Sequence, residues 1–231
     1  MTTHRNRRRL AVVGLPAVMA LAVLLSPVAA DGNEIPGAPG EMGDDLVRAD
    51  LGATCGGRPV TVDLSLGQVP TEANDVILGT LAADVVDGLG GNDIICGAGG
   101  PDRLNGGDDH DHAFGQAGAD VLRGSAGNDT LDGGDDVDVA FGGGGIDRLV
   151  GGLGPDGLNG GEQNDLLQAG PGADRLHGGN DDDRMNGDEG NDLLDAGAGD
   201  DRLNGDAQRD TCHGRTGADT QSGCEVTTGI P

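Results

Sequence analysis

The sequence contains no Trp, no Tyr, no Lys and only two Phe among its 231 residues. A globular core of the ordinary kind draws on aromatic and large aliphatic side chains, so this composition argues against one. The 14 basic residues face 40 acidic ones, and the formal net charge is −26. We therefore expect neither nucleic acid nor an anionic membrane as a partner, because phosphates would be repelled. The charge favours cations, and composition alone leaves a disordered polyelectrolyte open as the alternative.

The segment 1–30 has the pattern of an export signal. Four Arg between positions 5 and 9 precede an apolar run over positions 10–25, and small side chains follow up to Ala30. This run is short for a membrane span and is typical of a signal peptide, with a retained anchor as the alternative. Removing the segment takes away four Arg and no acid, which leaves a charge of −30. We predict a secreted, extracellular chain, with the choice between the general and the twin-arginine export route left open.

Four cysteines fit an oxidising, extracellular compartment. They allow three disulfide pairings. We favour Cys212–Cys224 because it is local, and Cys55–Cys96, which would tie the lead-in to the start of the repeats. A zinc site is the alternative, although no CxxC pair is present.

A nonapeptide repeat dominates the chain, which contains 47 Gly. An Asp recurs at every ninth position without insertion or deletion, and a large aliphatic residue usually follows two positions later. The unit is G-G-x-G-x-D-x-U-x, where U is aliphatic. The repeat Asp residues are Asp75, Asp84, Asp93, Asp102, Asp111, Asp120, Asp129, Asp138, Asp147, Asp156, Asp165, Asp174, Asp183, Asp192, Asp201, Asp210 and Asp219.

The repeat predicts an all-β solenoid. The Gly-rich part of each unit suits a turn, and x-U-x makes a short strand whose middle side chain points inward. Two units close one coil, and coils stack about 4.8 Å apart. The Asp residues then form two columns, one starting at Asp75 and the other at Asp84.

Stacked carboxylates need a counter-charge. Neighbours roughly 5 Å apart repel by about 3 kcal/mol at an effective dielectric constant near 20. Calcium takes six to eight oxygen ligands, which carboxylates and turn carbonyls can supply. We therefore interpret the Asp residues as shared calcium ligands. The nine and eight Asp of the two columns leave fifteen gaps, and fifteen ions would cancel a charge of −30.

These units resemble the RTX (repeats-in-toxin, haemolysin-type) calcium-binding repeats, over about residues 70–222. Units such as "GLGGNDIIC" and "GSAGNDTLD" fit nearly every position. The resemblance implies a parallel β-roll of two short-strand sheets, with calcium held by each repeat Asp and by carbonyls of its glycine turn. The cysteine-closed end resembles secreted repeat proteins of Gram-positive bacteria.

Some units depart from the pattern. Ala73, Ala82, Gln163 and Gln208 replace Gly at the fourth position, and Asp does so in three further units. Because Asp tolerates a left-handed backbone better than Ala or Gln, we expect the weakest sites in the units with Ala or Gln.

Two histidines, His110 and His112, flank the repeat residue Asp111. Such a cluster could bind a transition metal. We interpret both His as exposed strand neighbours of a calcium ligand, with the transition-metal site as the alternative.

The domain organisation follows from these patterns. We expect a signal peptide (1–30), a linker and lead-in (31–70), the RTX roll (71–222) and a C-terminal tail (223–231). The lead-in is too short for a catalytic domain, so we expect no enzyme but a monomeric calcium-binding protein. The alternatives are an adhesin or surface-recognition module built on the roll, and an accessory to an enzyme or toxin on another chain.

Overall fold

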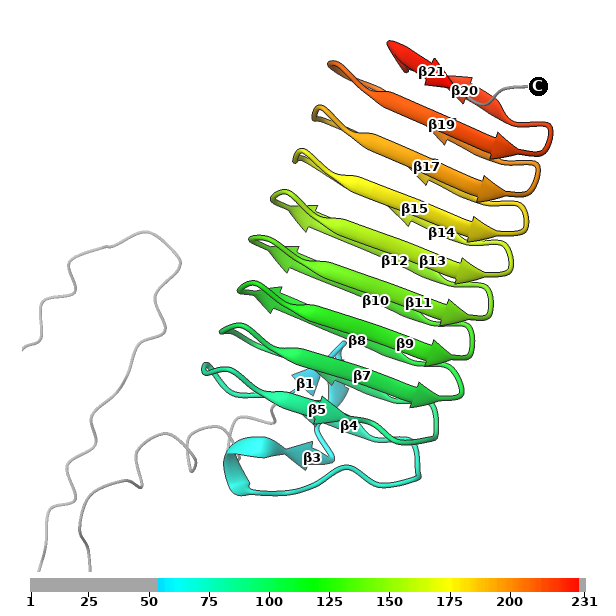
Figure 1. The fold of residues 1–231 in the computed structure, drawn as a ribbon. Coiled ribbons are helices and arrows are strands. Elements are labelled where there is room, and N and C mark those ends of the chain that lie inside the picture. Colours follow the sequence, from blue (N-terminus) through cyan, green and yellow to red (C-terminus); the bar gives the residue numbers. More distant parts are fainter. Residues whose placement is uncertain (1–53, 229–231) are drawn as a thin grey trace, which may run out of the picture. The chain divides into compact units, whose positions relative to one another are not determined.

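The computed structural model describes residues 54–228, and they form a β-solenoid in which strands stack coil upon coil (Figure 1). The only helical element among them is a 3-10 turn, η1 (Leu64–Leu66). Within this range, no helix has the length and apolar character needed to cross a membrane. The predicted signal peptide, 1–30, lies outside the described residues.

Two parallel sheets form the walls of the solenoid. The ten-stranded sheet contains β3 (Val62–Asp63), β4 (Val76–Leu78), β6 (Ile94–Cys96), β8 (His112–Ala117), β10 (Thr130–Asp135), β12 (Arg148–Leu153), β14 (Leu166–Gln168), β16 (Arg184–Asn186), β18 (Arg202–Asn204) and β20 (Thr220–Ser222). The nine-stranded sheet contains β5 (Val85–Asp87), β7 (Arg103–Asp108), β9 (Val121–Ala126), β11 (Val139–Gly144), β13 (Gly157–Glu162), β15 (Arg175–Asn180), β17 (Leu193–Ala198), β19 (Thr211–Thr216) and β21 (Val226–Thr228).

The register confirms the predicted coil of two repeat units. Val76 pairs with Ile94, and Thr130 pairs with Arg148, each two units further along the chain. The spacing is shorter by three positions at both ends, where Val62 pairs with Ile77 and Thr211 pairs with Val226. The sheets therefore extend beyond the nonapeptide units at both ends.

Many strands are longer than the x-U-x segment that the repeat predicts. Ten of them continue into the turn, as in β10, where pairing with β12 skips Gly133 and resumes at Gly134 and Asp135. Because the turns stack in the same register as the strands, the backbone of the second and third turn positions also pairs between coils. The ladder of hydrogen bonds thus continues into the turns.

The predicted inward column forms the core. Each of its buried side chains is at most 3% exposed, and burying a large aliphatic one contributes roughly 1.5–3 kcal/mol. The last residue in the column, Gln221, is partly exposed. The buried members are Ile77, Val86, Ile95, Leu104, Ala113, Leu122, Leu131, Ala140, Leu149, Leu158, Leu167, Leu176, Met185, Leu194, Leu203 and Cys212.

A second, smaller cluster lies on the outer face of the first coils. The antiparallel hairpin of β1 (Thr54–Cys55) and β2 (Arg58–Pro59) brings Cys55 against Val76, Leu78 and Cys96. Phe114 packs against this cluster, which gives this aromatic residue a structural role. The repeat pattern alone does not account for its presence.

Both predicted disulfides are confirmed. Cys55 and Cys96 are bonded with a Cα–Cα distance of 5.8 Å, and Cys212 and Cys224 with one of 5.9 Å. No free cysteine remains among residues 54–228, so the zinc alternative lacks cysteine ligands there. One bond ties the hairpin to β6, and the other ties the segment after β20 to β19.

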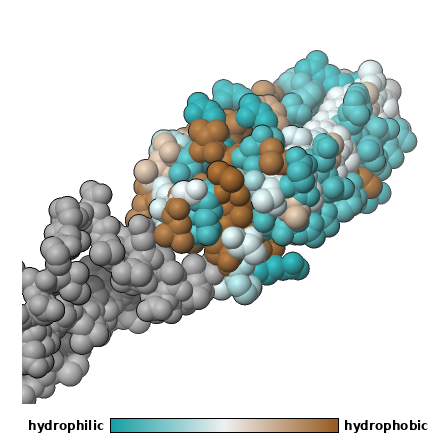
Figure 2. Space-filling view, turned by 90° about the horizontal axis from the view of Figure 1, so that it is seen from below, coloured by the Kyte–Doolittle hydropathy of each residue, from teal (hydrophilic) through white to brown (hydrophobic). Residues whose placement is uncertain are grey.

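Apolar side chains are exposed where the solenoid begins. Figure 2, which looks at this end from below, shows hydrophobic surface alternating with hydrophilic surface there. The largest exposed fractions belong to Leu81 (80%), Val85 (79%) and Val69 (74%). Later coils present mostly hydrophilic side chains in the same view.

At Gly127, a fourth turn position, both the backbone angle and the available space require glycine. Gly127 has φ = 141°, and a Cβ there would collide with the carbonyl oxygen of Asp109 in the coil before. We expect Gly127→Ala to lower the free energy of unfolding in calcium by about 2–3 kcal/mol, because strain and a backbone collision add. Gly144→Ala is the control, since nothing lies closer than 4.0 Å to its added Cβ. Equal denaturant midpoints for the two variants would contradict this account.

Candidate metal centre

The repeat Asp residues form two columns along the solenoid, and all seventeen lie among the described residues. Sixteen are buried, and Asp84, near the start of the second column, is partly exposed. In fifteen of them, Oδ1 accepts a hydrogen bond of 2.7–3.1 Å from the backbone N–H of the Asp one coil earlier. Each of these carboxylates therefore bridges two coils.

The second carboxylate oxygen has no hydrogen-bond partner in those same fifteen residues. A buried polar atom without a partner costs about 1–3 kcal/mol, and more when it is charged. These buried, unpartnered Oδ2 atoms belong to Asp93, Asp102, Asp111, Asp120, Asp129, Asp138, Asp147, Asp156, Asp165, Asp174, Asp183, Asp192, Asp201, Asp210 and Asp219.

A carbonyl oxygen of the next coil converges on the same place. A Cβ added to Gly124 would collide with Asp129 Oδ2 and would lie 2.7 Å from the Gly142 carbonyl oxygen. Glycine at the first turn position thus lets a carboxylate of one coil approach a carbonyl of the next. Ala169 and Ala196 stand at this position in two units, and both are fully buried.

Burial makes these carboxyl groups hold their protons more tightly. Burial is the main cause that raises the pKa of Asp138 from 3.8 to about 7. The hydrogen bond from the backbone N–H of Asp120 lowers this pKa. The neighbouring carboxylates of Asp120, Asp156 and Asp136 raise it further. Burial likewise raises the pKa of Asp165, Asp174 and Asp183 to about 7. It raises the pKa to about 6 in Asp93, Asp102, Asp111, Asp129, Asp156 and Asp201.

The donor set fits calcium. Unpartnered carboxylate oxygens and backbone carbonyls are hard oxygen ligands, which calcium prefers. Across residues 54–228, no three His, Cys, Asp or Glu side chains are grouped so that they could hold a metal ion. Carbonyl oxygens of the turns would therefore have to complete the coordination between two carboxylates.

The first turn of each column is built differently. Asp75 Oδ2 accepts hydrogen bonds from the N–H and hydroxyl of Thr71, at 2.8 and 2.9 Å. Asp84 Oδ2 accepts the same pair from Thr80, at 2.6 and 3.0 Å. These two oxygens are satisfied by the protein itself, and the sequence signal for this is a Thr at the second turn position.

The Gln residues at the fourth position preserve the turn. Gln163 and Gln208 adopt φ of 73° and 85°, and the Asp two positions later keeps its unpartnered Oδ2 in both units. Ala73 and Ala82 are not among the residues with positive φ. Two later fourth-position residues, Gly172 and Gly190, also lack a positive φ, but the Asp two positions later keeps its unpartnered Oδ2 in both units. Only in the first two units does a Thr satisfy that oxygen.

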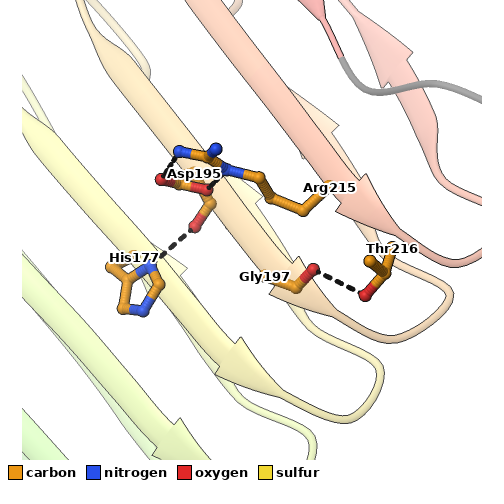
Figure 3. Close-up of polar contacts among 5 residues, drawn as sticks. All are labelled: His177, Asp195, Gly197, Arg215 and Thr216. Atoms are coloured by element: carbon orange, nitrogen blue, oxygen red, sulfur yellow. Dashed lines mark hydrogen bonds and ion pairs between the residues drawn. The ribbon is translucent and has the colours of Figure 1, made fainter.

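Asp195, on the outer face, shows how a partly exposed carboxylate differs from those in the columns. Asp195 receives two hydrogen bonds from the Arg215 guanidinium, and its backbone carbonyl lies 3.2 Å from His177 Nδ1 (Figure 3). Arg215 lowers the pKa of Asp195. An ion pair at the surface contributes roughly 0–1 kcal/mol, so this one adds little to the stability of β17 and β19. The Arg215 guanidinium balances the charge of the Asp195 carboxylate, unlike in the columns.

The two His beside Asp111 belong to no preformed group of metal-ligating side chains among residues 54–228. His110 Nδ1 accepts the backbone N–H of Asn128 at 2.8 Å, and His112 is exposed on β8. The hydrogen bond gives His110 a role in joining two turns. The geometry therefore favours the interpretation of both His as neighbours of a column Asp.

Comparison with known families agrees with the geometry. The model of the RTX calcium-binding nonapeptide repeat matches residues 71–104, 105–140, 141–176, 159–194 and 187–221. A comparison with curated proteins gives no match. The matched segments run continuously from residue 71 to residue 221, well over half of the 231 residues. The chain belongs to the RTX calcium-binding nonapeptide repeat family.

Proposed function

We propose that this calcium-binding repeat protein is a secreted, non-enzymatic protein whose roll folds when calcium binds outside the cell. The observation that carries the proposal is the set of fifteen buried Oδ2 atoms without a partner. A carboxylate in that position stabilises the roll only when it is protonated or when a cation lies beside it. Calcium supplies positive charge and accepts several oxygen ligands when bound.

The contacts of the first turns limit the number of ions. The two columns leave fifteen gaps between successive Asp residues, and the Oδ2 of the earlier Asp faces each gap. In the first gap of each column, this Oδ2 accepts hydrogen bonds from Thr71 or Thr80. Thirteen gaps then have an unpartnered carboxylate oxygen facing them. We therefore expect about thirteen ions in the regular columns, fewer than the fifteen that the repeat count allows.

Secretion is supported by the two disulfides and by the export pattern of the segment 1–30. Extracellular calcium-binding modules have weak sites, with dissociation constants in the range of about 10⁻⁴–10⁻³ M. A chain with these sites would stay unfolded inside the cell and fold after export, since the free energy of binding is then free energy of folding. We further propose that it acts as a monomer.

Equilibrium dialysis of the oxidised chain against calcium tests this function. We expect binding of about thirteen ions per chain, with positive cooperativity, because neighbouring gaps share each bridging Asp. Dialysis against magnesium is the control, since magnesium demands a stricter octahedral geometry and retains its waters. Binding of fewer than about four calcium ions, or equal binding of magnesium, would contradict the proposal.

A further inference from the structure

The segment after the last nonapeptide unit continues the second Asp column. β21 pairs with β19 in parallel, with Thr211 opposite Val226, so this coil is three positions shorter than a regular one. The turn between β20 and β21 runs only from Gly223 to Glu225. Glu225, which comes directly before the strand, therefore occupies the place that an Asp takes in every regular unit.

The contacts of Glu225 match this placement. Its Oε2 accepts the backbone N–H of Asp210, which is the bond that each bridging Asp accepts through Oδ1. Its own N–H donates to the Asp210 carbonyl at 3.1 Å. In regular coils, that carbonyl bond comes from the residue after the Asp, as from Thr211 to Asp192. Because the turn is shorter, Glu225 alone makes both hydrogen bonds to Asp210, one with its side chain and one with its backbone N–H.

An unpartnered carboxylate oxygen faces the same gap. Asp210 is fully buried, and its Oδ2 has no hydrogen-bond partner. A Cβ added to Gly205 would lie 2.6 Å from Asp210 Oδ2 and 2.7 Å from the Gly223 carbonyl oxygen. Asp210 Oδ2 and the Gly223 carbonyl oxygen therefore lie close to each other in the gap between the coils of Asp210 and Glu225.

The regular coil before this gap has the same arrangement. A Cβ added to Gly187 would lie 2.6 Å from Asp192 Oδ2 and 3.0 Å from the Gly205 carbonyl oxygen. The carbonyl of Gly223 therefore stands where each regular coil places the carbonyl of its first turn residue. The Cys212–Cys224 disulfide anchors the residue between Gly223 and Glu225 to β19.

We propose that Asp210, the Gly223 carbonyl and Glu225 form a further calcium site, which closes the second column outside the nonapeptide pattern. The inference rests on the proposed function, because it assumes that the regular gaps bind calcium. It raises the expected number of ions from about thirteen to about fourteen. It also makes Glu225 a metal ligand, although the match to the family ends at residue 221.

Anomalous diffraction tests the site on crystals of the full oxidised chain grown with calcium. We expect a calcium peak between Asp210 and Glu225, and its loss in the Glu225→Gln variant. The Gln side chain can still accept the Asp210 N–H, so the turn keeps its hydrogen bond while the ligand charge is removed. Glu189→Gln, at an exposed turn position of the preceding coil in the same column, is the control and should keep every peak.

The outcomes separate this inference from the proposed function. Peaks along both columns without one between Asp210 and Glu225 would overturn the terminal site alone. The same holds if the terminal peak keeps its full height in Glu225→Gln. A structure with no calcium peak in either column would overturn the proposed function together with the terminal site.

Discussion

In the presence of a chelator, the chain is expected to be unfolded at pH 8 and to gain the β-roll as the pH falls towards 5. Many column carboxyl groups have pKa values of about 6 to 7 in the folded chain, against an ordinary value of 3.8. A raised pKa means that the folded state binds the proton more tightly than the unfolded state. The stability contribution is therefore fully present below about pH 4 and is lost as the pH rises through 6 to 7.

The size of the effect depends on the number of carboxyl groups that titrate together. Ten column Asp residues have a pKa of about 6 or 7, for example Asp93 and Asp183. Each additional proton held by the folded state changes stability by about 1.4 kcal/mol per pH unit. Several such protons are enough to move a small domain from mostly unfolded to mostly folded across two pH units.

Circular dichroism across a pH series checks this prediction in chelator and in calcium. With calcium present, the dependence should reverse, because a proton and a cation compete for the same oxygen, and the roll should persist at pH 8. Light scattering controls for aggregation at low pH. A chain in chelator that is as β-rich at pH 8 as at pH 5 would contradict the account of the columns.

Asp138→Asn is expected to have opposite effects with and without calcium. Asp138 lies inside the second column, accepts the Asp120 N–H through Oδ1 and donates its own N–H to Asp156. With calcium, the variant loses a charged ligand shared by two gaps, and we expect the free energy of unfolding to fall by about 3–5 kcal/mol. In chelator at pH 8, it removes a buried charge that repels its neighbours, and we expect a gain of about 1–3 kcal/mol.

The matched control is Asp135→Asn. Asp135 is exposed in the turn before Asp138, and its substitution removes the same formal charge. We expect a change within about 0.5 kcal/mol in both conditions. Urea unfolding gives the comparison in calcium. In chelator, where the chain is expected to be unfolded at pH 8, the comparison is the pH at which each variant is half folded. An Asp138→Asn chain that loses stability in chelator as well would mean that the carboxylate acts mainly as a turn residue.

The regular part of the fold could be predicted because one local rule repeats without a gap. The regular spacing of Asp and aliphatic residues defines the coil of two units, the inward column and the two Asp columns, and the register confirms the coil at Thr130 and Arg148. The pairing of Cys212 with Cys224 followed from their short separation. These features depend on position within the repeat, which the sequence displays directly.

The features that could not be predicted lie where the repeat stops or is substituted. Thr71 and Thr80 satisfy the Asp oxygen with their own side chains, which a pattern of Gly and Asp does not show. Glu225 enters the column after a turn shortened by three positions, so it falls outside a search for a period of nine. Phe114 packs under a hairpin whose position depends on the fold of the whole N-terminal coil.

Calcium titration of the oxidised chain at pH 7.5, followed by far-ultraviolet circular dichroism, is the most direct test of the central claim. The account predicts a cooperative change from coil to β-structure in calcium, and none at the same concentration of magnesium. A spectrum already rich in β-structure in chelator at this pH would contradict it. In that case, the buried carboxylates would be stable without a cation.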